Sequence, residues 1–221
     1  MGDRGSTVAP PDVLTPTQRT LARIILSALP DGFALAGGGA MNESGVVDRP
    51  TQDLDVFGPF GSQQAAATMA TDALAKAGYA SHRLVDAEGF VRLSISVDDG
   101  IVLVDIGNDL RLFDPVATEL GPVISIPELA ADKTLALFGR AAARDLIDVR
   151  ALVQRLGLDV VLDLAAAKDR GFALPWFIAG VRQAASHDAD EFELPERELA
   201  DLRAWALALA DDLEARPPQE R

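Results

Sequence analysis

The sequence predicts an α+β fold, in which a small mixed sheet with helices is followed by an all-helical C-terminal domain. Strand-like apolar runs separated by turn signals fill the first half of the chain, and helical periodicity fills the second. The change falls near residue 124, just before a proline-bearing helix start. We therefore expect a flexible tail over 1–16, an α/β core over 17–124 and a helical domain over 125–221.

Helices and short strands alternate in the expected core, and glycine and proline mark many of their ends. The helices carry apolar residues at spacings of three and four, whereas the strands are short apolar or alternating runs. The expected elements, in order, are a helix over Thr17–Leu29, a strand over Phe33–Ala36, a short helix over Ala40–Ser44, a strand over Asp53–Phe57, a helix over Gln63–Ala77 that ends at Gly78, and strands over Val91–Val97 and Ile101–Ile106.

The last two strands form a predicted hairpin around Asp98-Asp99-Gly100. In the first of them, apolar residues alternate with Arg92 and two serines, so one face is apolar and the other polar. The second, Ile101–Ile106, is apolar except for Asp105, a composition typical of a central strand with both faces covered. His82 precedes the hairpin in a Ser-His-Arg stretch that we expect to be a loop.

The second half of the chain is helical in pattern. Ser125 and Glu128 have the spacing of a capping box, with a proline in the first turn, and predict a helix that begins there and runs to Gly139. A second helix is expected over Ala141–Leu156, and another over Glu196–Ala215.

Composition excludes several classes of site. The 221 residues include no cysteine, which rules out disulfides, thiol nucleophiles and cysteine-based zinc sites. Two histidines are too few for a histidine-rich metal centre. The net charge of −14 argues against a general nucleic-acid binder, because Lys and Arg supply most of the affinity for phosphates. Trp176 and Trp205 fall in apolar helical settings, so we expect both in the core.

No apolar run approaches the ~20 residues that a membrane helix needs, and the longest, Ile101–Val104, is interrupted by Asp105. The N-terminal segment lacks the apolar stretch of a signal peptide. We therefore expect no membrane association and a cytoplasmic protein.

Asp53 and Asp55 are the first candidates for chemistry. Two residues apart on a strand, their side chains emerge from the same face. Like charges ~4 Å apart repel by about 4 kcal/mol at an effective dielectric near 20, and a divalent cation offsets that cost. Oxygen-only ligands favour magnesium or manganese. The alternative is an exposed Asp-x-Asp at the start of a strand.

Asp105 interrupts a strand that is too apolar to hold an unpaired carboxylate cheaply. If its strand is a neighbour of the Asp53 strand, three carboxylates converge on one spot, the arrangement that two-metal phosphoryl transfer needs. The alternative is a carboxylate that caps the end of the strand.

Gly37-Gly38-Gly39 lies between a predicted strand and a predicted helix, where backbone N–H groups can approach a phosphate. A Rossmann fingerprint fails here, since Asn42 takes its third glycine position and the acid at the required distance begins a strand instead of ending one. No P-loop lysine follows either.

Two stretches of the chain resemble known motifs. Gly37–Ala40 followed by Asp48–Phe57 resembles the first motif of the polymerase-β-like nucleotidyltransferases, and more narrowly that of the AbiEii/AbiGii family, nucleotidyltransferase toxins of type IV toxin–antitoxin systems. The stretch Leu129–Asp148 is similar to that family's Lys-plus-Arg-Asp helical motif. The resemblance spans about Phe33–Leu156 and implies a polymerase-β-like core.

Lys133 is the lysine of the second motif. It aligns with Leu129 and Leu137 at four-residue spacing, so its stem follows a half-buried helical stripe. Its ammonium either reaches solvent or points into a cleft. The resemblance implies the cleft, where the ammonium would meet the triphosphate and the negative charge that develops during transfer. Asp145, on the next helix, either orients this lysine or binds the nucleotide.

These features predict a metal-dependent nucleotidyltransferase that moves a nucleoside monophosphate from an NTP to an acceptor hydroxyl. Asp53, Asp55 and Asp105 would bind Mg²⁺ or Mn²⁺, and Gly37 and Gly38 would cradle phosphates. The resemblance adds a toxin that acts on tRNA or another macromolecule, and a cognate antitoxin protein. Two alternatives stay open: an aminoglycoside-type antibiotic nucleotidyltransferase, which the acidic charge would suit, and a nucleotide-binding module without catalysis.

Overall fold

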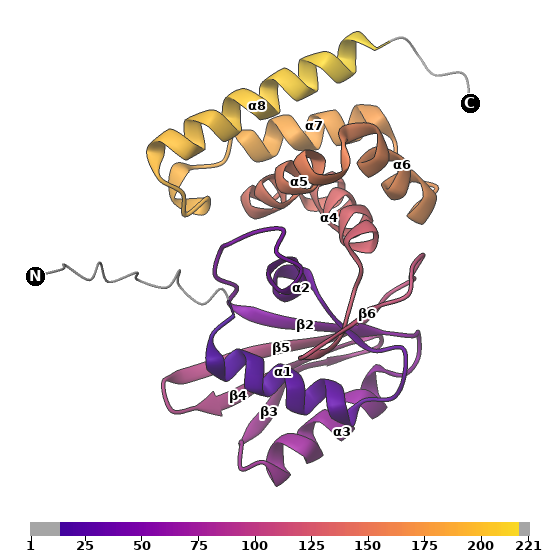
Figure 1. Ribbon diagram of the computed structural model, residues 1–221, viewed down its shortest axis with the longest axis vertical. Helices are drawn as coiled ribbons and strands as arrows, with labels where there is room; N and C mark the ends of the chain where they lie inside the picture. The colour runs from indigo at the N-terminus through magenta and orange to yellow at the C-terminus, as the bar shows by residue number, and fades with distance from the viewer. Residues whose placement is uncertain (1–13, 217–221) are drawn as a thin grey trace, which may run out of the picture. The chain divides into compact units, whose positions relative to one another are not determined.

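The computed structural model describes residues 14–216, and this part of the chain contains eight α-helices and a seven-stranded mixed sheet (Figure 1). The residues form two compact units. One holds the described chain up to Asp109 together with Pro115–Val123, and the other holds Leu110–Asp114 and the described chain from Ile124 onward. The expected combination of a mixed sheet with helices is confirmed, whereas the first thirteen residues of the expected tail lie outside the described residues.

The first unit is built from all seven strands and three helices. Its elements are α1 (Pro16–Ala28), β1 (Ala34–Ala36), α2 (Gly37–Glu43), β2 (Asp53–Gly58), α3 (Gln63–Lys76), β3 (Ser81–Ala87), β4 (Phe90–Val97), β5 (Gly100–Asn108), β6 (Val116–Thr118) and β7 (Gly121–Val123).

The strands are ordered β3-β4-β5-β2-β1-β7-β6. β5 is central, as its apolar sequence predicts, and pairs antiparallel with β4 and parallel with β2. α1 and α3 contact one another and cover one face of the sheet (Figure 1). Leu54 and Val56 of β2 are fully buried. Because side chains alternate along a strand, Asp53 and Asp55 emerge on the opposite side of β2.

Two local expectations for this unit are wrong. α2 begins at Gly37 and not at Ala40, so the three glycines form the first turn of a helix instead of a loop before it. The stretch around His82 is not a loop but β3, an edge strand with mostly exposed side chains. An edge strand with little buried surface lacks the apolar alternation that reveals strands in a sequence. The short strands β6 and β7 were not predicted.

The second unit is helical. It contains α4 (Ile126–Arg140), α5 (Ala143–Leu156), α6 (Leu158–Lys168), α7 (Leu174–Ala185), the 3₁₀ turn η1 (Ala189–Glu191) and α8 (Glu196–Ala215). Its apolar core includes the buried side chains of Phe177, Leu146 and Leu202. Among residues 14–216, no helix combines the length and the apolar character needed to cross a membrane.

The predicted capping box at the start of α4 is wrong. Ser125 is the N-cap residue, but its hydroxyl makes no cap bond. Glu128 is fully buried and accepts the backbone N–H groups of Leu112 and Phe113, both at 2.9 Å. Its other oxygen accepts from Nζ of Lys168 at 2.6 Å. A buried carboxylate needs such partners, and these bonds attach the segment before β6 to the helical unit.

Trp176 is exposed, contrary to the prediction that both tryptophans lie in the core. Its relative exposure is 70%, while its neighbours Phe177 and Ile178 supply the buried face of α7. The spacing of apolar residues identifies the buried side of a helix. An aromatic residue next to that side is also surrounded by apolar residues in the sequence, so the sequence alone does not show that it is exposed. Trp205 packs partly buried against the core, with the Arg150 guanidinium 5.9 Å from its ring centroid.

His187 links two parts of the helical unit. Its Nδ1 lies 2.9 Å from Oε1 of Glu191, and its Nε2 lies 2.9 Å from the carbonyl oxygen of Ala141. Ala141 ends α4 in the left-handed region, at φ 50°. The hydrogen bond to Glu191, followed by that to the Ala141 carbonyl, raises the pKa of His187, because the imidazolium donates to both acceptors.

This arrangement predicts a pH-dependent contribution to stability. A raised pKa in the folded state means that the contribution is fully present below the unfolded pKa of about 6.5 and is lost as the pH rises through the folded value. In urea unfolding, the free energy of unfolding of wild type should therefore exceed that of His187→Gln by more at pH 5.5 than at pH 8.5. A difference in unfolding free energy that does not change with pH would contradict this role.

Candidate active site

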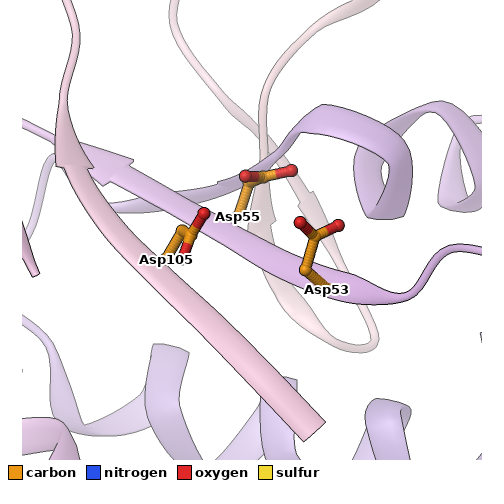
Figure 2. Close-up of side chains that lie close together, drawn as sticks. All are labelled: Asp53, Asp55 and Asp105. Atoms are coloured by element: carbon orange, nitrogen blue, oxygen red, sulfur yellow. The ribbon is translucent and has the colours of Figure 1, made fainter. Parts of the chain in front are cut away.

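Three carboxylates converge on one side of the sheet (Figure 2). Asp53 and Asp55 project from β2, and Asp105 projects from β5, where it is the register partner of Asp55. One oxygen from each carboxylate lies within 4.8 Å of the other two. The expectation that these two strands are neighbours is therefore confirmed.

The donor set fits a hard divalent cation. All three donors are carboxylates, the ligands that magnesium and manganese prefer. Two oxygens on opposite sides of Mg²⁺ at its usual bond length are about 4 Å apart, so small side-chain rotations bring these three into range. Asp105 is 5% exposed, whereas Asp53 and Asp55 are half-buried and remain accessible.

Arg92 is part of this site, although sequence reasoning placed it only on the polar side of its strand. Its Nε donates to Oδ1 of Asp105 at 2.6 Å, and its Nη2 donates to Oδ2 at 2.6 Å. The hydrogen bonds and charge of Asp105 raise the pKa of the Arg92 guanidinium, and the charges of Asp53 and Asp55 add to this effect. The sequence contained the signal, because a hairpin around Asp98–Gly100 sets Arg92 directly opposite Asp105.

The glycine turn packs directly against the carboxylates. Gly37 has φ 54°, and a Cβ built on it would lie 1.8 Å from Oδ2 of Asp55. A Cβ on Gly38 would lie 2.6 Å from Oγ1 of Thr51. Because Gly37 and Gly38 have no side chains, the backbone of the first turn of α2 can approach the candidate site closely.

Gln18 supports the segment that leads into β2, a role the sequence did not reveal. It is 5% exposed, and its Nε2 donates to the carbonyl oxygen of Thr51 at 2.8 Å. Thr51 in turn donates from Oγ1 to the carbonyl oxygen of Asp53 at 3.2 Å. Gln18 also completes a capping box with Thr15, which fixes the start of α1.

Lys133 and Asp145 belong to the helical unit, and each has its own partner there. Lys133 is 7% exposed and does not extend to solvent: its Nζ lies 2.8 Å from Oδ2 of Asp148. The fully buried Asp145 instead accepts from Nε and Nη2 of Arg140, at 2.7 and 2.8 Å. The carboxylate paired with Lys133 is thus Asp148 and not Asp145. Of the two roles considered for Asp145, nucleotide binding stays a prediction.

The chain is similar to nucleotidyltransferases at the level of sequence and fold. The family model described as nucleotidyl transferase AbiEii toxin, type IV TA system, matches residues 19–221. JHP933 from Helicobacter pylori is 19% identical with a TM-score of 0.55, over 90% of this chain and 92% of that one. An H. pylori protein provisionally assigned as a nucleotidyltransferase is 19% identical with a TM-score of 0.54, over 90% of this chain and 96% of that one. No curated protein matches the chain.

Gly37→Ala tests the contact between the glycine turn and Asp55. We expect the added methyl group to displace the carboxylate and to weaken Mn²⁺ binding by about tenfold or more, which corresponds to about 1.4 kcal/mol. Gly45→Ala is the matched control, because Gly45 has a similar φ of 61° but no atom within 4 Å of the added Cβ. Equal Mn²⁺ affinity in both variants would contradict the contact.

Asp148→Asn should destabilise the protein more than Asp145→Asn. The first change leaves the buried Lys133 ammonium without the charge of its partner, a loss that typically costs about 3 to 5 kcal/mol. The second leaves Arg140, whose side chain is 58% exposed and stays hydrated. Urea unfolding measures the loss in the free energy of unfolding of each variant. A loss in Asp145→Asn that equals or exceeds the loss in Asp148→Asn would show that Lys133 does not depend on Asp148.

Proposed function

Because this chain belongs to the AbiEii family of nucleotidyl transferase toxins of type IV toxin–antitoxin systems, we propose that its three aspartates form a metal-dependent site that transfers a nucleoside monophosphate from an NTP to an acceptor hydroxyl. The observation that carries this proposal is the convergence of the Asp53, Asp55 and Asp105 oxygens within 4.8 Å. A degenerate binding module would have no reason to keep such a costly concentration of charge.

In this proposal Asp53, Asp55 and Asp105 hold Mg²⁺ or Mn²⁺. Held there, a divalent ion would supply a lowered pKa to the attacking hydroxyl and positive charge beside the triphosphate and the leaving pyrophosphate. The N–H groups of Gly37 and Gly38 lie in the first turn of α2, where they have no partner within the helix, and we assign them to the phosphates.

The transfer forms a bond between the acceptor oxygen and the α-phosphorus and breaks the bond to the bridging oxygen of the pyrophosphate. Asp105 completes the group of three carboxylates and so helps to activate the acceptor hydroxyl. The lowered pKa of that hydroxyl lets its proton pass to water as the new bond forms. Lys133 keeps the role that the family resemblance implies, to stabilise negative charge on the phosphates. Asp145 is proposed to contribute to nucleotide binding.

Membership of a toxin–antitoxin family supports a macromolecular acceptor and a protein partner. We propose that the acceptor is tRNA, that a cognate antitoxin protein opposes the toxin, and that both act in the cytoplasm. The net charge of −14 instead favours a cationic acceptor such as an aminoglycoside, so an antibiotic nucleotidyltransferase is the second candidate.

Labelled triphosphates separate these candidates. The protein is incubated with each NTP, Mg²⁺ and either total tRNA or aminoglycosides, and the label is followed by electrophoresis or thin-layer chromatography. We expect the wild-type protein to label tRNA. Label on the aminoglycoside alone would contradict the toxin function and support an antibiotic nucleotidyltransferase.

Asp55→Asn should lower the rate of transfer by about three orders of magnitude, since each 1.36 kcal/mol of lost stabilisation is tenfold in rate and a metal site supplies several kcal/mol. Asp72→Asn, at an exposed position of α3, is the matched control and should keep the wild-type rate. Equal transfer by Asp55→Asn and wild type would leave no catalytic role for the three carboxylates.

A further inference from the structure

Arg92 occupies both oxygens of the carboxylate that the proposed metal site requires. The two side chains form a fork with 2.6 Å contacts at each oxygen, on register partners of the β4–β5 hairpin. Two parallel bonds of this kind fix the orientation of a carboxylate more firmly than a single bond does. In the described structure, Arg92 is thus the group that holds Asp105 in place.

A guanidinium and a divalent cation make conflicting demands on Asp105. A cation bound by this carboxylate would lie within a few ångströms of the guanidinium charge, and the two positive groups would repel one another. The fork also takes two of the about four lone-pair sites that a carboxylate offers, which leaves a cation only the remaining two. Coordination of a cation by Asp105 is therefore weakened while the fork is closed, and it is strengthened when the fork loosens or opens.

The arginine is the partner that is free to move. The Asp105 side chain is 8% exposed on the central strand β5, whereas the Arg92 side chain is 36% exposed. Arginine also has a long flexible stem, which lets its head group move to solvent while the backbone stays in the sheet. The ring of Phe90, two residues earlier on the same strand, lies 5.9 Å from the guanidinium carbon and offers it a further contact.

We propose that Arg92 is a built-in counter-ion of the candidate site, which orients Asp105 in the metal-free protein and competes with an entering divalent cation, so that it sets the affinity of the site for metal. This inference rests on the proposed function, since it takes the three aspartates as metal ligands. Arg92 is a positioning residue in this account, because it acts through Asp105.

The test is direct Mn²⁺ binding to the protein without nucleotide, measured as free Mn²⁺ by electron paramagnetic resonance. Competition predicts that Arg92→Gln binds Mn²⁺ about tenfold more tightly than wild type, whereas a purely structural arginine predicts weaker binding. Arg92→Lys keeps the charge and should stay within about threefold of wild type. Arg83→Gln is the matched control, because it removes an arginine paired with Asp86 at 2.8 Å on β3 and should leave the affinity unchanged.

A second measurement needs no variant of Arg92. In the NMR spectrum of wild type, the Nε–H signal of Arg92 should shift and exchange faster with water as Mg²⁺ is added, while that of Arg83 should not change. Equal or weaker Mn²⁺ binding by Arg92→Gln, or an Arg92 signal that stays unchanged while the site fills, would overturn the inference.

The same titrations separate this inference from the proposed function. Wild-type binding that is lost in Asp105→Asn supports the metal site whatever Arg92 does. Binding that is equal in wild type and Asp105→Asn would remove the metal site itself, and the role of Arg92 with it.

Discussion

The repulsion among Asp53, Asp55 and Asp105 is the constraint on which the rest of the sheet unit depends. Two such charges ~4 Å apart cost about 4 kcal/mol at an effective dielectric near 20, and three of them converge within 4.8 Å. The fold meets this cost with positive charge, because the Arg92 fork takes both oxygens of the most buried member. The apolar side of β2 and β5 supplies the rigidity, since Leu54 and Val104 are fully buried on the same strands. The guanidinium of Arg92 thus offsets the repulsion in the folded protein, and a divalent cation, with its higher charge, can still compete for Asp105.

The helical unit follows the same electrostatic rule. Its fully buried carboxylates each face a basic side chain: Glu128 faces Lys168, Asp145 faces Arg140 and Asp148 faces Lys133. Removing one member of a buried pair leaves an uncompensated charge, so such pairs fix the direction of the groups they contain. The ammonium of Lys133 is consequently positioned by α5 before any nucleotide is present. This buried pairing also explains why Lys133 is not on the exposed side of α4 despite its charge.

Much of the sheet and its acidic site could be predicted from the sequence, and the misses have identifiable physical causes. The interruption of a central apolar strand by Asp105 predicted a convergence that the β2–β5 register shows. The Arg92 contact was equally available, because a turn that pairs Val97 with Gly100 also pairs residue 92 with residue 105. Glu128 was not predictable in this way, since its partners Leu112 and Lys168 are brought to it by tertiary structure. The edge strand β3 left no periodic signal because its side chains are mostly exposed.

The most direct test of the central claim is a crystal of the protein soaked with manganese and a non-hydrolysable nucleoside triphosphate, with data collected at a wavelength where manganese scatters anomalously. We expect an anomalous peak between the carboxylates of Asp53, Asp55 and Asp105, with phosphate density beside the first turn of α2 and the Arg92 fork loosened or open. Manganese bound elsewhere, with the Arg92–Asp105 fork intact and no density among the three aspartates, would contradict it.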